Sequence, residues 1–124
     1  MPNHPSDICL EACNACATAC SQCLTACLQE PHVNALTRCI ALDIECAEIC
    51  RFTAAAVARG SEPLVAICRL CAESCDLCAE ECSKHEHEHC QRCADACMKC
   101  AAACHQMVEH ALEGEHTTEM AHAA

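Results

Sequence analysis

The chain has 124 residues, nineteen of them cysteine, a formal net charge of −11 at pH 7 and Phe52 as its one Phe, Tyr or Trp. This length predicts a single domain over 1–124. The negative charge and the lack of aromatic rings for base stacking argue against nucleic acid and anionic membranes as partners.

Helices are predicted in chain order by cysteines that recur at steps of three and four residues. A Ser-Asp capping signal followed by the first cysteine ladder predicts a helix over about 6–29. Pro31 favours a second helix over 32–59, because proline in a first turn gives up no helical hydrogen bond. Gly60 is a typical C-terminal stop, and a Ser-Glu-Pro segment then opens a third helix over 62–84.

The fourth helix is predicted over 87–113. The step of eight residues from Cys82 to Cys90 breaks the ladder, so we expect a tight polar turn between the third and fourth helices. Gly114 is expected to end the fourth helix, which leaves 115–124 as a flexible tail.

The cysteine ladders also predict how the helices pack. Steps of three and four average 3.5 residues, the period of a helix seam in a bundle. Short connections make sequential helices antiparallel neighbours, so the expected fold is all-α, an up-down-up-down four-helix bundle with a cysteine-lined core. The core cysteines are Cys9, Cys13, Cys16, Cys20, Cys23, Cys27, Cys39, Cys46, Cys50, Cys68, Cys71, Cys75, Cys78, Cys82, Cys90, Cys93, Cys97, Cys100 and Cys104.

Several chemistries compete for these thiols. Local disulfides are disfavoured, because neighbours on one helix face hold their Cβ atoms about 5–6 Å apart and a disulfide needs about 3.8 Å. Iron–sulfur motifs sit on loops, commonly with a proline after the last cysteine, and no cysteine here precedes proline. A zinc-thiolate buffer or sensor and a thiol-redox protein remain alternatives, although stacked four-thiolate zinc sites would each leave an excess negative charge in the core.

Cu(I) fits the ladders best. It is a soft ion suited to thiolates, and exchanging one H⁺ for one Cu⁺ leaves the charge of the core unchanged. Two metal–sulfur bonds in line span about 4.6 Å, which the rotamers of a Cys-x3-Cys pair can reach. Eight such pairs occur, and they leave Cys39, Cys68 and Cys90 to bridge between helices near the bundle ends.

These Cys-x3-Cys and Cys-x2-Cys ladders over about 6–113 resemble the bacterial copper storage proteins. The resemblance implies a homotetramer of four-helix bundles, each binding many Cu(I) ions, and names no copper donor or acceptor. The N-terminus has no basic region followed by an apolar stretch, and no apolar run could span a membrane, so we expect the cytoplasmic branch of the family. We expect storage and detoxification without catalysis, because closed thiolate sites leave no position for a substrate.

Histidine and methionine could add ligands at the bundle ends. Met107 continues the last cysteine stripe, and His105 and His110 flank it, so these three are candidate Cu(I) ligands of an entrance. The alternative is that Met107 is ordinary core and the two histidines are solvated. A second cluster in the polar turn, weighed against a solvated turn, contains His85, His87 and His89.

Two further features concern the second helix. Asp43 stands where Cys39 would find its partner four residues on. A hard carboxylate is a poor Cu(I) ligand, so we expect Asp43 to accept a thiol hydrogen bond or to turn outward. Larger residues off the cysteine face, such as Ile44 and Phe52, fill gaps between helices or form a subunit interface.

Overall fold

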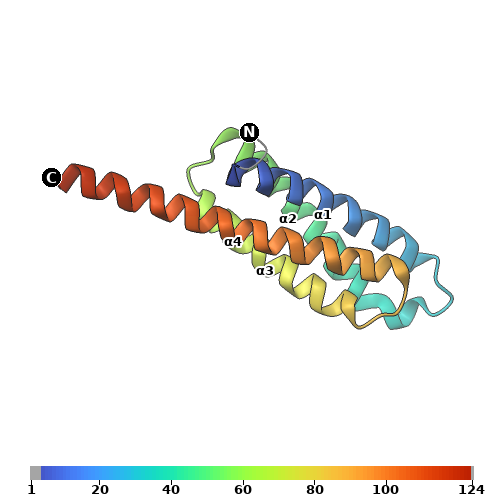
Figure 1. Ribbon diagram of the computed structural model, residues 1–124. Helices are drawn as coiled ribbons and strands as arrows, with labels where there is room; N and C mark the ends of the chain where they lie inside the picture. Colours follow the sequence, from blue (N-terminus) through green and yellow to red (C-terminus); the bar gives the residue numbers. More distant parts are fainter. Residues whose placement is uncertain (1–3, 124) are drawn as a thin grey trace.

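The computed structural model describes the backbone of residues 4–123 and the side chains of residues 4–114. It contains four long helices, and the predicted all-α four-helix bundle is confirmed (Figure 1). A short 3₁₀ helix, η1, precedes the second of them. The bounds are α1 Pro5–Leu28, η1 Val33–Leu36, α2 Thr37–Arg59, α3 Leu64–Ser83 and α4 Glu88–Ala123.

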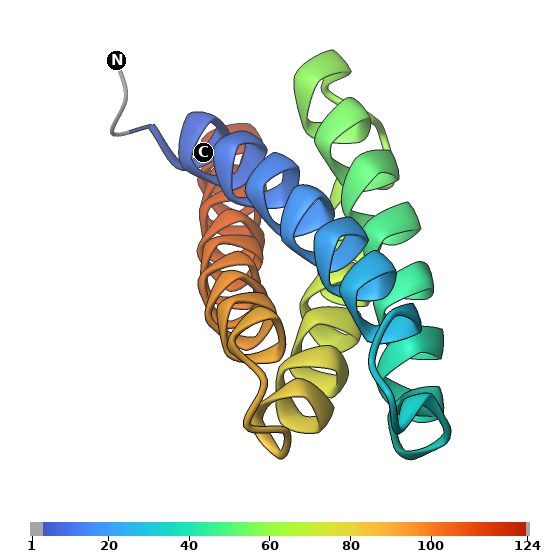
Figure 2. The ribbon, with the colours of Figure 1, turned by 90° about the vertical axis from the view of Figure 1, so that its right-hand side faces the viewer.

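The helices form a square in which each packs against two neighbours. α1 packs against α2 and α4, and α3 packs against the same two helices, whereas the backbones of the diagonal pairs lie farther apart (Figure 2). The connections 29–36 and 84–87 lie together at one end, called here the two-loop end. The start of α1 and the turn between α2 and α3 lie at the opposite end, where α4 projects beyond the other helices (Figure 1).

Local chemistry explains where α1 begins and where α2 ends. The Nδ1 atom of His4 accepts a hydrogen bond of 3.1 Å from the backbone N–H of Ser6, so His4 caps α1. Gly60 has a φ of 63°, a left-handed conformation that favours glycine, and its N–H returns to the carbonyls of Ala56 and Val57. α2 therefore ends where the sequence predicted.

Two helices begin later than predicted. The second helix does not run from 32, because the chain leaving α1 turns back through η1 and α2 starts at Thr37. His32 has a φ of −106° and a ψ of 51°, outside the helical region. The third helix begins at Leu64 rather than at 62, because Pro63 also has a positive ψ, of 42°. The helix-favouring composition of the two segments therefore did not determine where α2 and α3 begin.

α4 ends later than predicted. It runs through Gly114 to Ala123, where the sequence predicted an end near 113. A lone glycine inside a helix costs about 1 kcal/mol relative to alanine, which does not by itself end a helix, and no proline follows. The sequence also predicts a flexible tail over 115–124. The side chains of these residues, and the backbone of residue 124, lie outside the described part of the chain, so this stays a prediction.

Cysteine and alanine fill the bundle. All nineteen cysteines have no exposed surface, and buried alanines pack between the helices beside them. Few larger residues are buried: Leu36 lies near the two-loop end, and Val57, Met107 and Val108 lie toward the opposite end. Small side chains bring the helices close together, so the sulfur atoms occupy the centre that leucine fills in most bundles.

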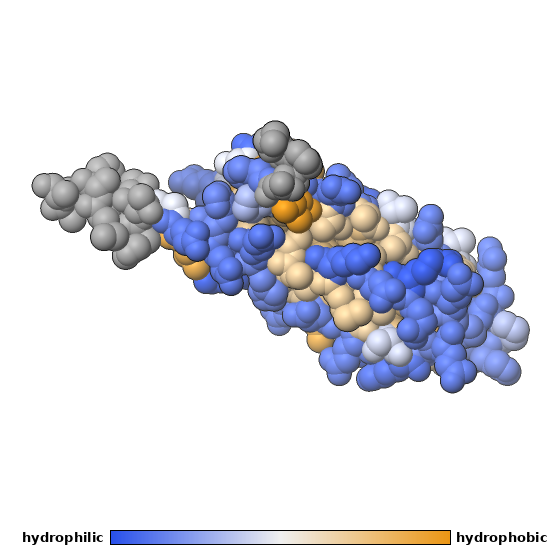
Figure 3. All heavy atoms as spheres, viewed as in Figure 1, coloured by the Kyte–Doolittle hydropathy of each residue, from blue (hydrophilic) through white to orange (hydrophobic). Residues whose placement is uncertain are grey.

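The face of the molecule shown in Figure 3 is mostly polar. An apolar band between α1 and α4 interrupts it, and Figure 3 shows this band facing the viewer. The band is a shallow groove whose apolar lining is Ile8, Ala12, Ala15, Ala96 and Ala103. Within the described residues, no helix combines the length and the apolarity that crossing a bilayer requires.

Candidate metal centre

The thiols form a continuous column along the bundle axis, and every cysteine is a free thiol. Because the ladders repeat every 3.5 residues on average, each helix directs its sulfur atoms to one side, and the bundle turns that side inward. The column runs from Cys9 and Cys104, with sulfurs 3.9 Å apart, to Cys27 and Cys90, 4.0 Å apart, at the two-loop end.

Sulfur atoms approach one another as closely between helices as within them. Within a helix the Sγ–Sγ distances are 3.8–3.9 Å, in Cys16/Cys20, Cys23/Cys27, Cys46/Cys50 and Cys78/Cys82. Between helices, Cys16 and Cys97 are 3.6 Å apart and Cys39 and Cys82 are 3.3 Å apart. Contacts between helices thus run the length of the column, beyond the three bridging cysteines expected from the sequence.

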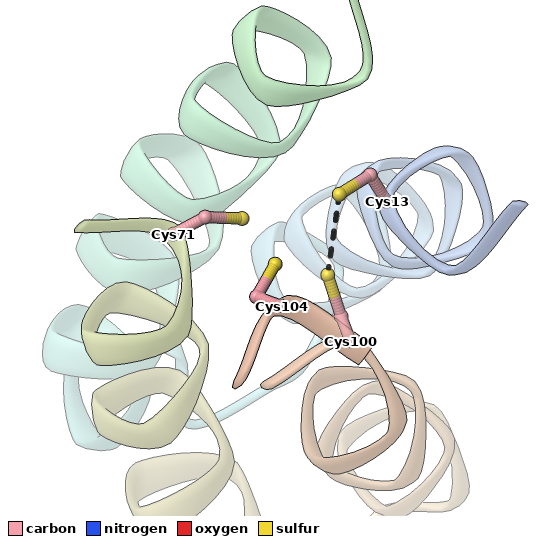
Figure 4. Close-up of side chains that lie close together, drawn as sticks. All are labelled: Cys13, Cys71, Cys100 and Cys104. Atoms are coloured by element: carbon pink, nitrogen blue, oxygen red, sulfur yellow. Dashed lines mark hydrogen bonds between the residues drawn. The ribbon is translucent and has the colours of Figure 1, made fainter. Parts of the chain in front are cut away.

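These contacts assemble groups of four thiols from three helices. Figure 4 shows Cys13 of α1, Cys71 of α3 and two cysteines of α4, Cys100 and Cys104. Their sulfurs lie within 4.8 Å of one another, and those of Cys13 and Cys100 are 3.7 Å apart. Metal–sulfur bonds of about 2.3 Å require sulfur separations of about 3.8 Å in a tetrahedral site and about 4.6 Å in a linear one. The sulfur–sulfur separations within the column span this range.

Neighbouring groups share sulfur atoms. Cys16 belongs to one set with cysteines of α2 and α3 and to another with cysteines of α1, α2 and α4. A thiolate that serves two sets can bridge two ions, so the geometry suits connected clusters as well as isolated pairs. Further sets include Cys16/Cys46/Cys50/Cys75, Cys16/Cys20/Cys46/Cys97, Cys20/Cys78/Cys93/Cys97 and Cys23/Cys27/Cys39/Cys90.

Asp43 points into the column. It has no exposed surface, and its Oδ1 atom accepts hydrogen bonds from the thiols of Cys78 and Cys93, both at 3.3 Å, and of Cys82 at 3.6 Å. Burial raises the pKa of Asp43 to about 8. Of the two expected arrangements, the carboxyl group adopts the one that accepts thiol hydrogen bonds, and it is mostly protonated at neutral pH.

The three histidines of the polar turn have separate surroundings. His85 donates through Nε2 to Glu81 at 2.7 Å, and His87 donates through Nδ1 to Glu30 at 2.7 Å. His89 instead turns inward. The sequence contains a signal that separates His89 from the other two: it lies four residues before Cys93 and so continues the cysteine stripe of α4.

His89 faces the last four-thiol group of the column. Its Nδ1 atom is 3.5 Å from the sulfurs of Cys23 and Cys90 and 3.8 Å from that of Cys27. The imidazole therefore adds one nitrogen donor to the thiols at the two-loop end. Burial and repulsion from Cys39 raise the pKa of Cys27 to about 11, which keeps this thiol protonated until a metal displaces the proton.

Comparison with known proteins identifies the family. A family model described as copper storage protein matches residues 2–109. The chain belongs to the copper storage protein family. This confirms the resemblance that the cysteine ladders indicated.

Solved copper storage proteins have the same fold. Copper storage protein 3 of Bacillus subtilis, in Cu(I)-bound and apo forms, is 46% identical, with TM-scores of 0.81 and 0.78. Those alignments cover 85% and 83% of this chain and 99% and 98% of the solved chains. A cytosolic copper storage protein of Streptomyces lividans, solved with five coppers, is 40% identical, with a TM-score of 0.83, over 85% of this chain and 92% of that one.

A curated relative matches over a shorter stretch. The uncharacterized cysteine-rich protein YhjQ of Bacillus subtilis (strain 168) is 47% identical over 68 residues, which are 55% of this chain and 63% of that protein. The chain thus matches less than two thirds of the length of this relative.

The three entrance residues expected from the sequence do not gather in this copper storage protein. Met107 is 7% exposed and packs with the core beyond the last thiols. His105 is exposed, with its Nε2 atom 4.0 Å from the carboxylate of Asp76. His110 packs its ring edge-on against His4, with ring centroids 5.2 Å apart. Only Met107 adjoins the column.

Proposed function

We propose that this chain stores Cu(I) in the cytosol, held by its nineteen cysteine thiolates inside the bundle. The observation that carries the proposal is the unbroken column of fully buried thiols, whose neighbouring sulfurs lie 3.3–4.0 Å apart. An ion within such a column would have several sulfur atoms within reach, and thiolate is the ligand that suits Cu(I), a soft ion.

Charge accounting favours a monovalent ion. Placing unpaired charge in a low-dielectric interior is costly, and four thiolates around one Zn(II) leave two negative charges for every site. One Cu(I) for each displaced proton leaves the column neutral at any loading. Extra negative charge would be most costly at Cys39 and Cys82, because their sulfurs are 3.3 Å apart and Asp43 lies beside both.

We further propose that His89 is a ligand at the two-loop end. Nitrogen of imidazole binds copper well, and its Nδ1 atom is already among three thiols. The entrance predicted at His105, Met107 and His110 stays a prediction, because only the methionine side chain adjoins the thiols. Closed thiolate coordination also supports storage without catalysis.

Exposed apolar side chains support the predicted homotetramer. Phe52 and Leu70 are 56% and 54% exposed in the single chain, and both line a shallow groove between α2 and α3. Large apolar residues clustered in this way mark protein contact surfaces. Light scattering should give the mass of four chains, and Phe52→Glu should reduce that mass. Met98→Glu is the matched comparison, because Met98 lies on α4 and is about as exposed as Phe52.

The storage proposal is tested by anaerobic titration of the reduced protein against a chromophoric Cu(I) chelator. The expected capacity approaches one ion per cysteine, or about nineteen. Zn(II) bound beforehand should be displaced by Cu(I). Saturation after a few ions, with Zn(II) retained against Cu(I), would instead identify a zinc-thiolate buffer. Reversible loss of thiols under mild oxidant, without tight metal binding, would identify a thiol-redox protein.

A further inference from the structure

A carboxylate lies behind the histidine that faces the thiols. Glu30 follows the end of α1, where its backbone N–H donates to the carbonyl of Cys27 at 3.2 Å. One carboxylate oxygen, Oε2, accepts a hydrogen bond of 2.7 Å from Nδ1 of His87. The other, Oε1, is 3.9 Å from Nε2 of His89. Glu30 thus links the two imidazoles.

The His89 ring has two faces of different character. Nδ1 lies among the sulfur atoms of Cys23, Cys27 and Cys90. Nε2, on the other side of the ring, is buried without a hydrogen-bond partner among the described residues. An unpartnered buried polar atom is uncommon in a folded protein and needs a physical reason.

Metal binding through Nδ1 supplies that reason. A neutral imidazole that gives the Nδ1 lone pair to a metal carries its proton on Nε2. That N–H then needs an acceptor in a buried position, and Glu30 Oε1 is the atom facing it. The separation of 3.9 Å has to shorten by about 1 Å to make a hydrogen bond, which the Glu30 side chain can do while its backbone stays anchored.

The position of Glu30 is itself fixed. The ring of His87 holds Oε2 and stacks on the ring of His89, with centroids 5.2 Å apart and planes 6° apart. The side chains of Glu30 and His89 are 25% and 13% exposed, so water competes little for the facing atoms. The carboxylate is therefore held pointing at Nε2.

We propose that Glu30 is a positioning residue for the metal site at the two-loop end. It accepts a hydrogen bond from the Nε2–H of His89 and so fixes the tautomer and the ring orientation that direct the Nδ1 lone pair at the thiols. His87 holds Glu30 in place. This inference rests on the proposed role of His89 as a Cu(I) ligand. Carboxylates that orient metal-binding histidines in this way typically change metal affinity about 10- to 100-fold.

The test uses full-length protein labelled with ¹⁵N in histidine and loaded anaerobically with a few equivalents of Cu(I). The change in the His89 Nδ1 resonance reports copper at this site, and a Cu(I) chelator is added until half of that change is lost. Glu30→Ala should weaken the site about 10- to 100-fold. Glu30→Gln should restore most of the affinity, since the amide oxygen can accept from Nε2–H of His89 while the amide NH2 donates to Nδ1 of the other His87 tautomer. Glu86→Ala removes an equal charge from an exposed position in the adjacent loop and should have no effect.

The outcomes distinguish the positioning role of Glu30 from the role of His89 as a ligand. Wild-type affinity in Glu30→Ala, or a Glu30→Gln variant as weak as Glu30→Ala, would overturn the positioning role and leave His89 as a ligand. A His89 Nδ1 resonance that does not move on loading would instead refute His89 as a ligand. In the variant His89→Ala, whose Cu(I) affinity is followed by chelator competition alone, adding Glu30→Ala should cause no further loss, because the carboxylate acts only through the imidazole.

Discussion

Replacing Asp43 by asparagine tests how the buried carboxyl group affects the metal-free protein. Burial holds the pKa of Asp43 at about 8, against 3.8 for an ordinary aspartate. The folded chain therefore keeps a proton that the unfolded chain releases as the pH rises. The stability from this group is fully present below pH 3.8 and is lost as the pH approaches about 8.

The magnitude follows from the size of the shift. Between these two pKa values, one proton separates the folded from the unfolded state, so stability falls by about 1.4 kcal/mol for each pH unit. Over the interval from pH 4 to pH 7 the loss reaches an upper limit of about 4 kcal/mol. The amide side chain of the Asp43→Asn variant cannot ionise but still accepts thiol hydrogen bonds through its oxygen, so this loss should disappear.

The assay is urea denaturation of reduced apo-protein under anaerobic conditions, followed by far-UV circular dichroism from pH 4 to pH 8. The difference in unfolding free energy between wild type and Asp43→Asn should be small at pH 4 and should grow with pH in favour of the variant. Subtracting the two profiles removes the contribution of the surface carboxylates that both proteins share. Parallel profiles across this range would refute the assignment of a proton to buried Asp43.

Three further predictions concern the backbone and the thiol column. Gly60→Ala should lower the unfolding free energy by about 1–2 kcal/mol in the same urea assay, because the φ of 63° strains a residue with a Cβ although nothing lies within 4 Å of that atom; an unchanged midpoint would contradict this. Removing copper with a chelator should leave the far-UV spectrum helical, because backbone hydrogen bonds and packed alanines do not depend on metal, and a random-coil spectrum would show that the metal organises the fold. Cys16→Ala should lower Cu(I) capacity by more than one ion, because the Cys16 sulfur lies within 4 Å of four other sulfurs; Cys9→Ala, at the end of the column, is the control, and an equal loss in both variants would argue against shared thiolates.

The sequence predicts most of the fold because its strongest signal is local. A ladder such as Cys9 to Cys27 specifies both a helix and its buried face through spacing alone. The stop at Gly60 is also local, since it needs only a residue that tolerates positive φ. The start of α2 at Thr37 depends on how the chain turns back from α1, and the continuation of α4 through Gly114 depends on the absence of a competing stop.

The site is less predictable than the fold, for a similar reason. Pairs within one helix follow from spacing, but the approach of Cys39 to Cys82 at 3.3 Å depends on the rotation and axial shift of two helices. Those quantities are set by side-chain packing between helices and leave no pattern in one segment. His89 could have been distinguished from its neighbours by its register with Cys93, whereas its alignment with Glu30 arises only when the end of α1 meets the start of α4.

Copper loading changes what surrounds Asp43, and a protonated carboxyl group suits both states. Where its neighbours are thiols, its Oδ1 atom accepts from Cys78 and Cys93. Cu(I) takes the place of those thiol protons, so the same sulfurs become acceptors. A protonated carboxyl can then donate its own hydrogen to a thiolate and stay satisfied without adding charge to the core. Asparagine also carries a donor and an acceptor, whereas leucine carries neither. Asp43→Asn should therefore keep the wild-type Cu(I) capacity, while Asp43→Leu should leave thiol donors of the apo core unpaired and reduce its stability; equal apo stabilities of these two variants at pH 7 would contradict the argument.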